Sequence, residues 1–318
     1  MGLDHVILVK VASTAVVSWL LGLTETQAVD AISHAWMDGH PLRVYRHTGN
    51  TGPRKGWAGG DACMRAVQLA LLTRSGQPGA PTVLSATRWG FYDAIFQCKA
   101  FSLPRPFGTW VIENTIFKVV PGEAHALSAI EAALLLRHRL TEQAIDLDTD
   151  IRKIKIRTHA AACLIIDKPG QLNNAADRDH CMQYMVAVTI LKGEQPAYCD
   201  YSDSSPWATD QRVTNLRQKM EIIEDEQFTK DYLFLQKKSL TSALSIEFVD
   251  GRWTEEICIQ YHLGSPSHPG TNEAVKAKVK RNFGLLFESA THERIERAVA
   301  TEKVTPVKVF VDLLWKGP

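Results

Sequence analysis

The sequence predicts an α+β protein in which a mainly helical unit, formed from both ends of the chain, is interrupted by a smaller unit that contains a sheet. Apolar residues recur at helical spacing through residues 1–103 and again from about Thr271. Between these parts, residues 151–158 (IRKIKIRT) alternate Ile with Arg and Lys, which is the period of a half-buried strand. Helices at both ends of a segment with strands favour the α+β class.

Length and composition limit the class of protein. The chain has 318 residues, of which 45% are apolar, so it can bury a substantial core and is long enough for about two domains. Its 36 Lys and Arg residues stand against 35 Asp and Glu, and a net charge of +1 attracts the chain neither to nucleic acid nor to a membrane. Any anion site must therefore be local.

The cysteines give no sign of a metal or cofactor site. No pair has the CxxC spacing, and no Cys/His spacing matches the ligands of zinc or an iron–sulfur cluster. A chain that buries its own core does not need a disulfide framework. We therefore expect reduced thiols, no metal and no cofactor.

The N-terminal part is expected to consist of helices. Residues 11–23 (VASTAVVSWLLGL) are an apolar run, but they are fewer than the ~20 residues of a membrane span, and no small-x-small cleavage site follows. A buried helix is the better interpretation. A second helix is predicted over 25–37, where Thr24 before Glu25 and Gln27 is close to a capping box, and a third near 61–73.

A boundary is predicted where the sequence PRPFG follows Leu103, because Pro and Gly interrupt regular structure. We expect a helical part over 1–103, an α+β unit over 104–270 and a helical return over 271–318. The middle unit should contain a helix over 125–140 (HALSAIEAALLLRHRL).

Two further strands are expected near the end of the middle unit. Residues 243–249 (ALSIEFV) and 253–261 (WTEEICIQY) flank Asp250-Gly251, which is a hairpin signal. With residues 151–158 they make a small antiparallel or mixed sheet, which the neighbouring helices would cover.

A basic, glycine-rich loop is the first candidate site. Residues 45–62 (YRHTGNTGPRKGWAGGDA) contain too much glycine to favour a helix, and glycine lets backbone amides approach an anion. Arginine binds carboxylates through two hydrogen bonds, so the loop suits a polyanionic small molecule. A phosphate-binding P-loop is excluded because Gly56, not Ser or Thr, follows Lys55. A solvated basic loop is the alternative. The basic residues in this loop and just before it are Arg43, Arg46, Arg54 and Lys55.

Two other polar groups stand beside predicted helices. In FKVVPGEAHA, Lys118 and His125 flank a Pro-Gly turn at a helix start, where His125 could be a neutral base or only a cap. In NNAADRDHCMQY, Asp177 is a candidate N-cap. Tyr184 lies on the same predicted helical face, either as a buried hydrogen-bond donor or as packing.

These groups resemble, in this order, the 2-methylcitrate dehydratases of the MmgE/PrpD family, which also includes cis-aconitate decarboxylase. The resemblance covers nearly the whole chain and rests on long phrases with specific residues at irregular positions. The phrases are GLDHVILVKVAS, SHAWMDGHPLRVYRHTGNTGPRKGWAGGDA, WGFYDAIF, ENTIFKVVPGEAH, IRTHAAACLIIDKPGQLNNAADRDHCMQYMVA and LLFES.

The resemblance implies a hydro-lyase that dehydrates 2-methylcitrate to 2-methyl-cis-aconitate in propionate catabolism. It implies a large helical domain with an inserted α+β lid, no iron–sulfur cluster, a small tricarboxylate substrate and a homodimer. The compartment would be the mitochondrion in a eukaryote and the cytoplasm in a bacterium. Family positions give a catalytic set of His5, Lys118, His125 and Tyr184, together with Lys55. On this hypothesis the basic residues hold the substrate carboxylates, so the substrate-binding set is Arg43, Arg46, Arg54 and Lys55.

Lys55, Lys118, His125 and Tyr184 are expected to face one cleft between the helical domain and the lid. The cations would hold the three carboxylates and stabilise the negative charge that develops during elimination. A neutral His would take or give the proton near neutral pH.

The chain departs from the family pattern at its start. Family members have a helical segment before GLDH, so we expect this chain to be a truncated form that lacks about the first third. An inactive fragment that binds carboxylates, or a partner protein through an uncovered helical face, is the alternative outside the enzymes. A cis-aconitate decarboxylase-like lyase is the alternative within them, although RHTGNTGPRK and NNAADRDHCMQY follow the dehydratase wording.

Overall fold

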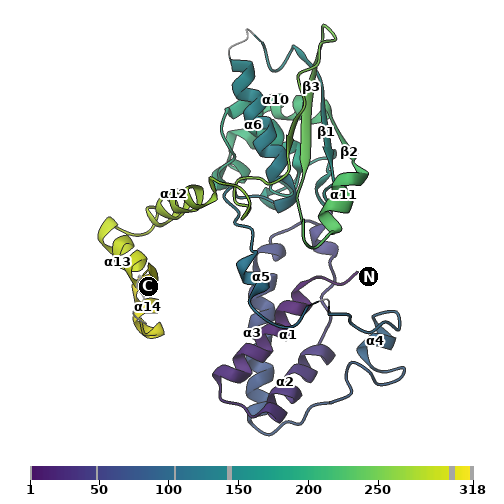
Figure 1. Cartoon of the computed structure of the whole chain (residues 1–318), viewed down its shortest axis with the longest axis vertical. Helices are drawn as coiled ribbons and strands as arrows, with labels where there is room; N and C mark the ends of the chain where they lie inside the picture. The colour runs from purple at the N-terminus through teal and green to yellow at the C-terminus, as the bar shows by residue number, and fades with distance from the viewer. Residues whose placement is uncertain (1, 48, 104, 142–144, 301–304, 316–318) are drawn as a thin grey trace. The chain divides into compact units, whose positions relative to one another are not determined.

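The computed structural model describes residues 2–47, 49–103, 105–141, 145–300 and 305–315, and it divides into two compact units (Figure 1). The first unit comprises Met1–Gly108, Asp167–Cys181 and Tyr201–Ala208. The second comprises Thr109–Ile166, Met182–Asp200 and Thr209–Pro318. About half of the chain is helical and the strands form one small sheet, which confirms the α+β class.

Three helices that pack pairwise form the centre of the first unit (Figure 1). They are α1 (Val6–Leu20), α2 (Glu25–Met37) and α3 (Arg54–Arg74). The second has the predicted bounds, and both hydrogen bonds of the Thr24–Gln27 capping box are present. The helix α3 presents a buried stripe of alanines at four-residue spacing, whose small side chains let α1 and α2 approach its backbone. These are Ala58, Ala62, Ala66 and Ala70.

The start of α3 corrects the prediction of a glycine-rich loop over 45–62. Arg54 and Lys55 lie in the first turn of the helix, directly after Pro53 at its N-cap. A glycine in a helix costs only about 1 kcal/mol relative to Ala, and the packing of an apolar face outweighs that cost. The described residues before Pro53 lie outside α3, and Val44–Arg46 form a short 3₁₀ turn.

The helix predicted from the apolar run 11–23 forms as α1, but its orientation differs from a buried apolar helix. Lys10, Thr14 and Ser18 are the buried side chains of its second to fourth turns. The Lys10 ammonium donates to the carbonyl of Asp38, and the Thr14 hydroxyl donates to the carbonyl of Lys10 at 2.8 Å. The exposed side chains are apolar and include Leu8, Val16, Trp19 and Leu20, with exposed fractions of 57–79%.

This exposed apolar face predicts that the chain associates in solution, because contiguous apolar surface favours contact with other molecules. Changing Trp19 to Lys should lower the apparent mass at micromolar concentration in analytical ultracentrifugation. Trp89→Lys is the matched control, since Trp89 is about as exposed, at 77%, and lies outside α1. Equal masses for the two variants would contradict the prediction.

The remainder of the first unit packs around aromatic side chains and a segment from the middle of the chain. The ring of Trp36 lies 4.8 Å from that of Phe91, in the short helix α4 (Phe91–Ala94), and 5.4 Å from that of Phe101. The segment Asp167–Cys181, with the short helix α8 (Ala175–Arg178), also belongs to this unit.

The second unit contains a four-stranded mixed sheet in the order β2-β1-β3-β4. β1 pairs parallel with β2 and antiparallel with β3, and β3 pairs antiparallel with β4. The mixed sheet is therefore confirmed, and β1 has the predicted bounds. The strands are β1 (Ile151–Thr158), β2 (Met220–Glu224), β3 (Ser242–Phe248) and β4 (Ile257–Ile259).

The turn at Asp250-Gly251 is confirmed. Gly251 has a φ of +85°, and its amide donates to the carbonyl of Phe248 at 3.0 Å. The returning strand is shorter than the predicted 253–261, because the Thr254 hydroxyl accepts the hydrogen bond of the Ile246 amide in place of a backbone carbonyl. Regular pairing resumes only at β4.

Helices cover the sheet and extend the second unit. Among them, α6 packs against β3 (Figure 1), β4 and α9. This helix corresponds to the one predicted over 125–140. The helices with sheet or interhelical contacts are α6 (Leu127–Thr141), α7 (Ala160–Ile166), α9 (Met182–Lys192), α10 (Gln211–Gln218) and α11 (Glu226–Leu233). The predicted helical character of 271–318 is confirmed by α12 (Thr271–Phe283), α13 (Ser289–Ala300) and α14 (Val307–Leu314). Its return to the N-terminal helical domain stays a prediction.

The remaining short elements in the described residues are α5 (Trp110–Glu113) and the 3₁₀ turns η2 (Ala124–Ala126), η3 (Tyr198–Tyr201) and η4 (Pro206–Ala208). In the described residues, no helix combines the length and apolar character that crossing a membrane requires.

Candidate functional site

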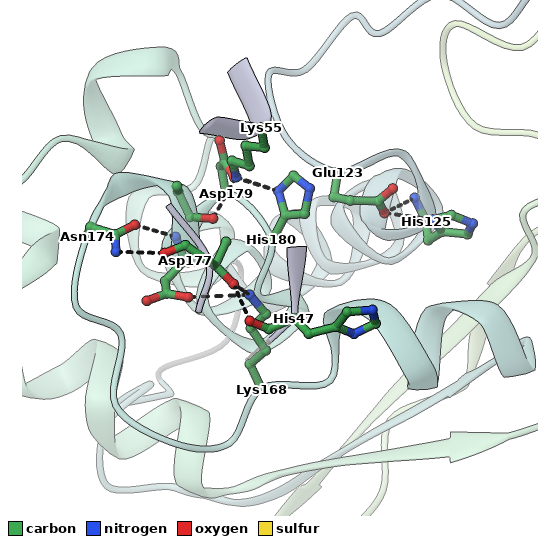
Figure 2. Close-up of polar contacts among 11 residues, drawn as sticks. His47, Lys55, Glu123, His125, Lys168, Asn174, Asp177, Asp179 and His180 are labelled. Atoms are coloured by element: carbon green, nitrogen blue, oxygen red, sulfur yellow. Dashed lines mark hydrogen bonds and ion pairs between the residues drawn. The ribbon is translucent and has the colours of Figure 1, made fainter. Parts of the chain in front are cut away.

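A partly buried polar group in the first unit consists of Lys55, Asp179 and His180, which we call the Lys55 cluster (Figure 2). Lys55 projects from the first turn of α3, and the other two residues follow α8. The Lys55 ammonium contacts the Asp179 carboxylate, the carbonyl of Ala176 at 2.6 Å and Nδ1 of His180 at 2.7 Å. His180 Nδ1 also lies 2.6 Å from Asp179 Oδ1.

The contacts of His180 Nδ1 make the proton distribution in the Lys55 cluster adjustable. This nitrogen can donate to the Asp179 carboxylate or accept from the Lys55 ammonium, but it cannot do both with one proton. A change of tautomer therefore changes which partner the ammonium keeps.

Burial sets the electrostatics of the Lys55 cluster. Removal from water lowers the pKa of the Lys55 ammonium, although the Asp179 carboxylate opposes that shift. Burial also raises the pKa of the Asp179 carboxyl, but the His180 hydrogen bond and the Lys55 charge outweigh it, so this pKa falls below its usual value. The pair is therefore an ion pair in which the lysine gives up its proton more readily than a solvated lysine.

A second layer of hydrogen bonds holds the segment that supplies Asp179. Lys168 is almost fully buried and donates to the Thr51 hydroxyl at 2.8 Å and to the Asp177 carboxylate at 3.4 Å (Figure 2). The side-chain amide of Asn174 donates to the Thr51 carbonyl at 3.1 Å. The loop before α3 is thus bound to the segment around α8.

The predicted N-cap at Asp177 is wrong. Asn174 caps α8, since its side-chain oxygen accepts from the Asp177 amide at 3.0 Å. Asp177 instead lies within the helix, where its carboxylate accepts from the Asn173 amide at 3.2 Å. Asn and Asp are equally good caps, so the sequence NNAAD did not determine which residue begins the helix.

The arginines of the basic segment have partners within the first unit. Arg46 donates to the buried carboxylate of Asp4 at 2.6 Å, which compensates its charge. Arg43 lies 3.4 Å from Nδ1 of His5, and burial lowers the pKa of that imidazole.

Arg54 is more available to a ligand. Its guanidinium stacks 4.4 Å from the Trp57 ring and contacts Asp61 at 3.4 Å, with 42% of its side chain exposed. Substrate binding by these residues stays a prediction.

A second polar group, in the second unit, contains Glu123, His125, His159 and Tyr232, which we call the His125 cluster. The Glu123 carboxylate lies 2.7 Å from Nδ1 of His125 and also accepts from the His125 amide at 2.7 Å (Figure 2). With Nδ1 donating to this carboxylate, Nε2 presents its lone pair as an acceptor. The hydroxyl of Tyr232 lies 3.4 Å from that Nε2.

His159 is a buried member that sequence reasoning missed. It follows β1 directly, has no exposed surface, and stacks on the Tyr232 ring at 4.4 Å with an interplanar angle of 12°. Burial, with the nearby His125 as a second cause, lowers the pKa of His159 to about 4. Its position after a predicted strand that ends in Thr158 was the available signal, because functional groups collect at strand ends.

Lys118 and Tyr184 complete the predicted catalytic set in the second unit. The residue before Lys118 pairs with the backbone of Gly264, and the Lys118 carbonyl accepts from Lys278. The buried Tyr184 hydroxyl donates to the carbonyl of Asp200 at 2.7 Å, as a buried donor should. Because Lys55 belongs to the first unit, the expectation that it shares a cleft with these residues stays a prediction. Within the described ranges, no group of three or more His, Cys, Asp or Glu side chains is placed to hold a metal ion.

The two clusters contain the groups that acid–base chemistry on a charged small molecule requires: a carboxylate-oriented histidine and a lysine with a lowered pKa. Comparison with family models identifies the family of the chain. The MmgE/PrpD N-terminal domain matches residues 1–104 and the MmgE/PrpD C-terminal domain matches residues 120–303. The chain is a member of the MmgE/PrpD family.

Curated relatives carry names from one reaction class. The chain is 50% identical over 319 residues to a 2-methylcitrate dehydratase-like protein, oryR, of Aspergillus oryzae, covering 100% of this chain and 64% of the relative. It is 51% identical over 312 residues to the alkylcitrate dehydratase phiI of a fungal species, covering 98% and 62%. It is 45% identical over 318 residues to the 2-methylcitrate dehydratase of Escherichia coli K12, covering 98% and 65%. The chain thus spans less than two thirds of the length of these relatives.

Proposed function

We propose that the protein is a hydro-lyase that removes water from 2-methylcitrate, or from a related alkylcitrate, to give 2-methyl-cis-aconitate or its alkyl counterpart. The observation that carries the proposal is the orientation of His125 by Glu123, which leaves Nε2 as a base in a chain half identical to proteins named for this dehydration. A role in propionate catabolism, and a homodimeric state, are part of the same proposal.

His125 would remove the proton from the carbon next to a substrate carboxylate. That C–H is weakly acidic, so the reaction needs both a base near neutral pH and positive charge where the carboxylate gains electron density. Lys118 and Lys55 are the proposed sources of this charge, together with Arg54, whose side chain is 42% exposed. A substrate carboxylate would compete with Asp179 for Lys55.

The proposal is tested by the absorbance of the conjugated double bond that dehydration creates. The purified chain, incubated with 2-methylcitrate, should produce that absorbance, and His125→Gln should abolish it. His138→Gln, in the exposed last turn of α6, is the matched control. Product formation by His125→Gln at the unaltered rate would refute the assignment of the base.

Lys55 has a separate prediction. Lys55→Met should reduce kcat/KM by about 30- to 1,000-fold, which corresponds to roughly 2–4 kcal/mol of lost transition-state stabilisation. It should also destabilise the fold, since the partly buried Asp179 carboxylate loses its cation.

Adding Asp179→Asn to Lys55→Met separates the two effects. The double variant removes the uncompensated charge, so its free energy of unfolding should recover while its activity stays low. Lys153→Met, which removes an exposed lysine paired with Glu221, controls for loss of surface charge. Recovery of activity together with stability would mean that Lys55 has only a structural role.

A further inference from the structure

Tyr232 is a polar residue that neither the sequence nor the proposed function assigns. Its hydroxyl lies 3.4 Å from Nε2 of His125, the nitrogen that faces away from Glu123. Both residues are partly exposed, with 13% of the His125 side chain accessible. A separation slightly longer than an ideal hydrogen bond is common in unliganded sites that tighten when substrate binds.

Three elements hold Tyr232 in this position. Tyr232 lies near the end of α11, and His125 belongs to η2. His159 directly precedes α7, which contacts both η2 and α11. The His159 ring stacks parallel to the Tyr232 ring, and the two histidine rings are 5.1 Å apart. Both ring nitrogens of His159 are buried without a hydrogen-bond partner, so its ring surface is what it contributes to these contacts.

A cation faces the same tyrosine. The ammonium of Lys238 lies 4.3 Å from the centre of the Tyr232 ring. A positive charge at this distance stabilises the phenolate that forms when the hydroxyl releases its proton. The surroundings of Tyr232 therefore suit a proton donor, and its neighbour His125 suits a proton acceptor.

We propose that Tyr232 is the catalytic acid that works with His125, and that His159 is the positioning residue that holds the Tyr232 ring. This inference rests on the proposed dehydration. His125 Nε2 takes the proton from the substrate carbon, and the electron pair of that C–H bond moves onto the adjacent carboxylate. The pair then returns to form the double bond as the C–O bond breaks. The Tyr232 hydroxyl gives its proton to the departing hydroxide, which leaves as water.

The same pair then returns to its starting state. The imidazolium of His125 passes its proton to the Tyr232 phenolate across the gap between Nε2 and the phenol oxygen. The substrate has lost one proton and one hydroxide, one water has formed, and both side chains have recovered their original protonation. No oxidant, metal or further reactant is required for this balance.

Tyr184 is the tyrosine that family position suggested, and its surroundings differ. Its hydroxyl is buried and donates to the carbonyl of Asp200 at 2.7 Å, whereas the Tyr232 hydroxyl lies beside the imidazole of His125. A donor that already serves a backbone carbonyl loses a hydrogen bond when it gives up its proton. The two tyrosines therefore make different predictions for the same substitution by Phe.

The test measures dehydration and hydrogen exchange in the intact chain. In deuterated water, the unaltered chain should exchange the substrate C–H that His125 removes and also form product. Tyr232→Phe should keep this exchange but lower product formation by about 100- to 10,000-fold, the usual range for a lost general acid. Tyr198→Phe, at an exposed tyrosine of the same unit, is the matched control. Product formation by Tyr232→Phe at the control rate would overturn the proposal.

A readout without turnover separates this inference from the proposed function. In protein labelled with ¹⁵N histidine, Tyr232→Phe should shift the Nε2 resonance of His125, because it removes the hydroxyl beside that nitrogen, and an unchanged resonance overturns the pair. If the shift occurs but the unaltered chain forms no product, the dehydration is refuted, and with it the catalytic role of Tyr232. His159→Phe, which keeps a stacking ring, should retain most activity, and His159→Ala should lose it; equal activities would overturn the positioning role.

Discussion

Replacement of Gly264 by Ala is expected to destabilise the protein by about 2–5 kcal/mol, from backbone strain and overpacking together. Gly264 has a φ of +109°, which L residues rarely adopt, and an added Cβ would lie 2.0 Å from the carbonyl oxygen of Phe117. The Gly264 carbonyl also accepts from the Phe117 amide at 2.9 Å, so the two segments cannot separate without losing this bond.

Gly251→Ala is the matched control for that substitution. Gly251 also has a positive φ, of +85°, but nothing lies within 4 Å of its added Cβ, so only the conformational cost of about 1–2 kcal/mol applies. Urea unfolding measures both free energies. Equal losses in the two variants would show that the Phe117 contact yields easily. Because Phe117 precedes Lys118, we expect Gly264→Ala also to reduce activity more than its stability loss explains.

The elements predicted from periodicity are those whose own residues determine them. The helix α2 and the strand β1 have the predicted bounds, since a capping box defines the first and strict alternation of Ile with charged residues defines the second. The strand β2 was not predicted. Its sequence, MEIIE, is short and lacks alternation, and its place in the sheet depends on parallel pairing with β1.

Tertiary packing explains the elements that were predicted wrongly. Three glycines after Lys55 suggested a loop, but the alanine stripe of α3 packs on α1 and α2 and extends the helix to Arg54. The apolar run in α1 suggested a buried helix, yet the buried face holds Lys10, whose ammonium finds carbonyl acceptors at Asp38 and Gly39. Such partners are distant in sequence, so composition alone could not indicate which face is buried.

The candidate site shows the same limit. Family position supplied Lys55 and His125, whereas their contacts come from residues that no local pattern connects to them. Asp179 is 124 positions from Lys55, and Tyr232 is 107 positions from His125. Glu123 is the exception, because a carboxylate two residues before a histidine at a helix start is visible in the phrase PGEAH.

His159 should make the stability of the protein depend on pH between about 4 and 6.5. The folded state holds its pKa at about 4, whereas an unfolded histidine has a pKa of about 6.5. Between these values the unfolded chain binds the proton and the folded chain does not, so the free energy of unfolding falls as the pH falls. At 1.36 kcal/mol for each pKa unit, the loss from this one group amounts to about 3 kcal/mol.

The comparison with His159→Phe isolates this contribution, because every other titrating group, including the buried His262, is common to both proteins. Phe keeps the ring that stacks on Tyr232 but cannot bind a proton. Urea unfolding at pH 7.5 and at pH 4.5 should therefore give a smaller loss of stability for the variant, and the difference between the two proteins should grow as the pH is lowered. Parallel pH profiles would mean that His159 is protonated as easily in the folded protein as in the unfolded chain. The ring beside Tyr232 would then carry a positive charge at mildly acidic pH, and it would repel the proton that His125 must accept from the substrate.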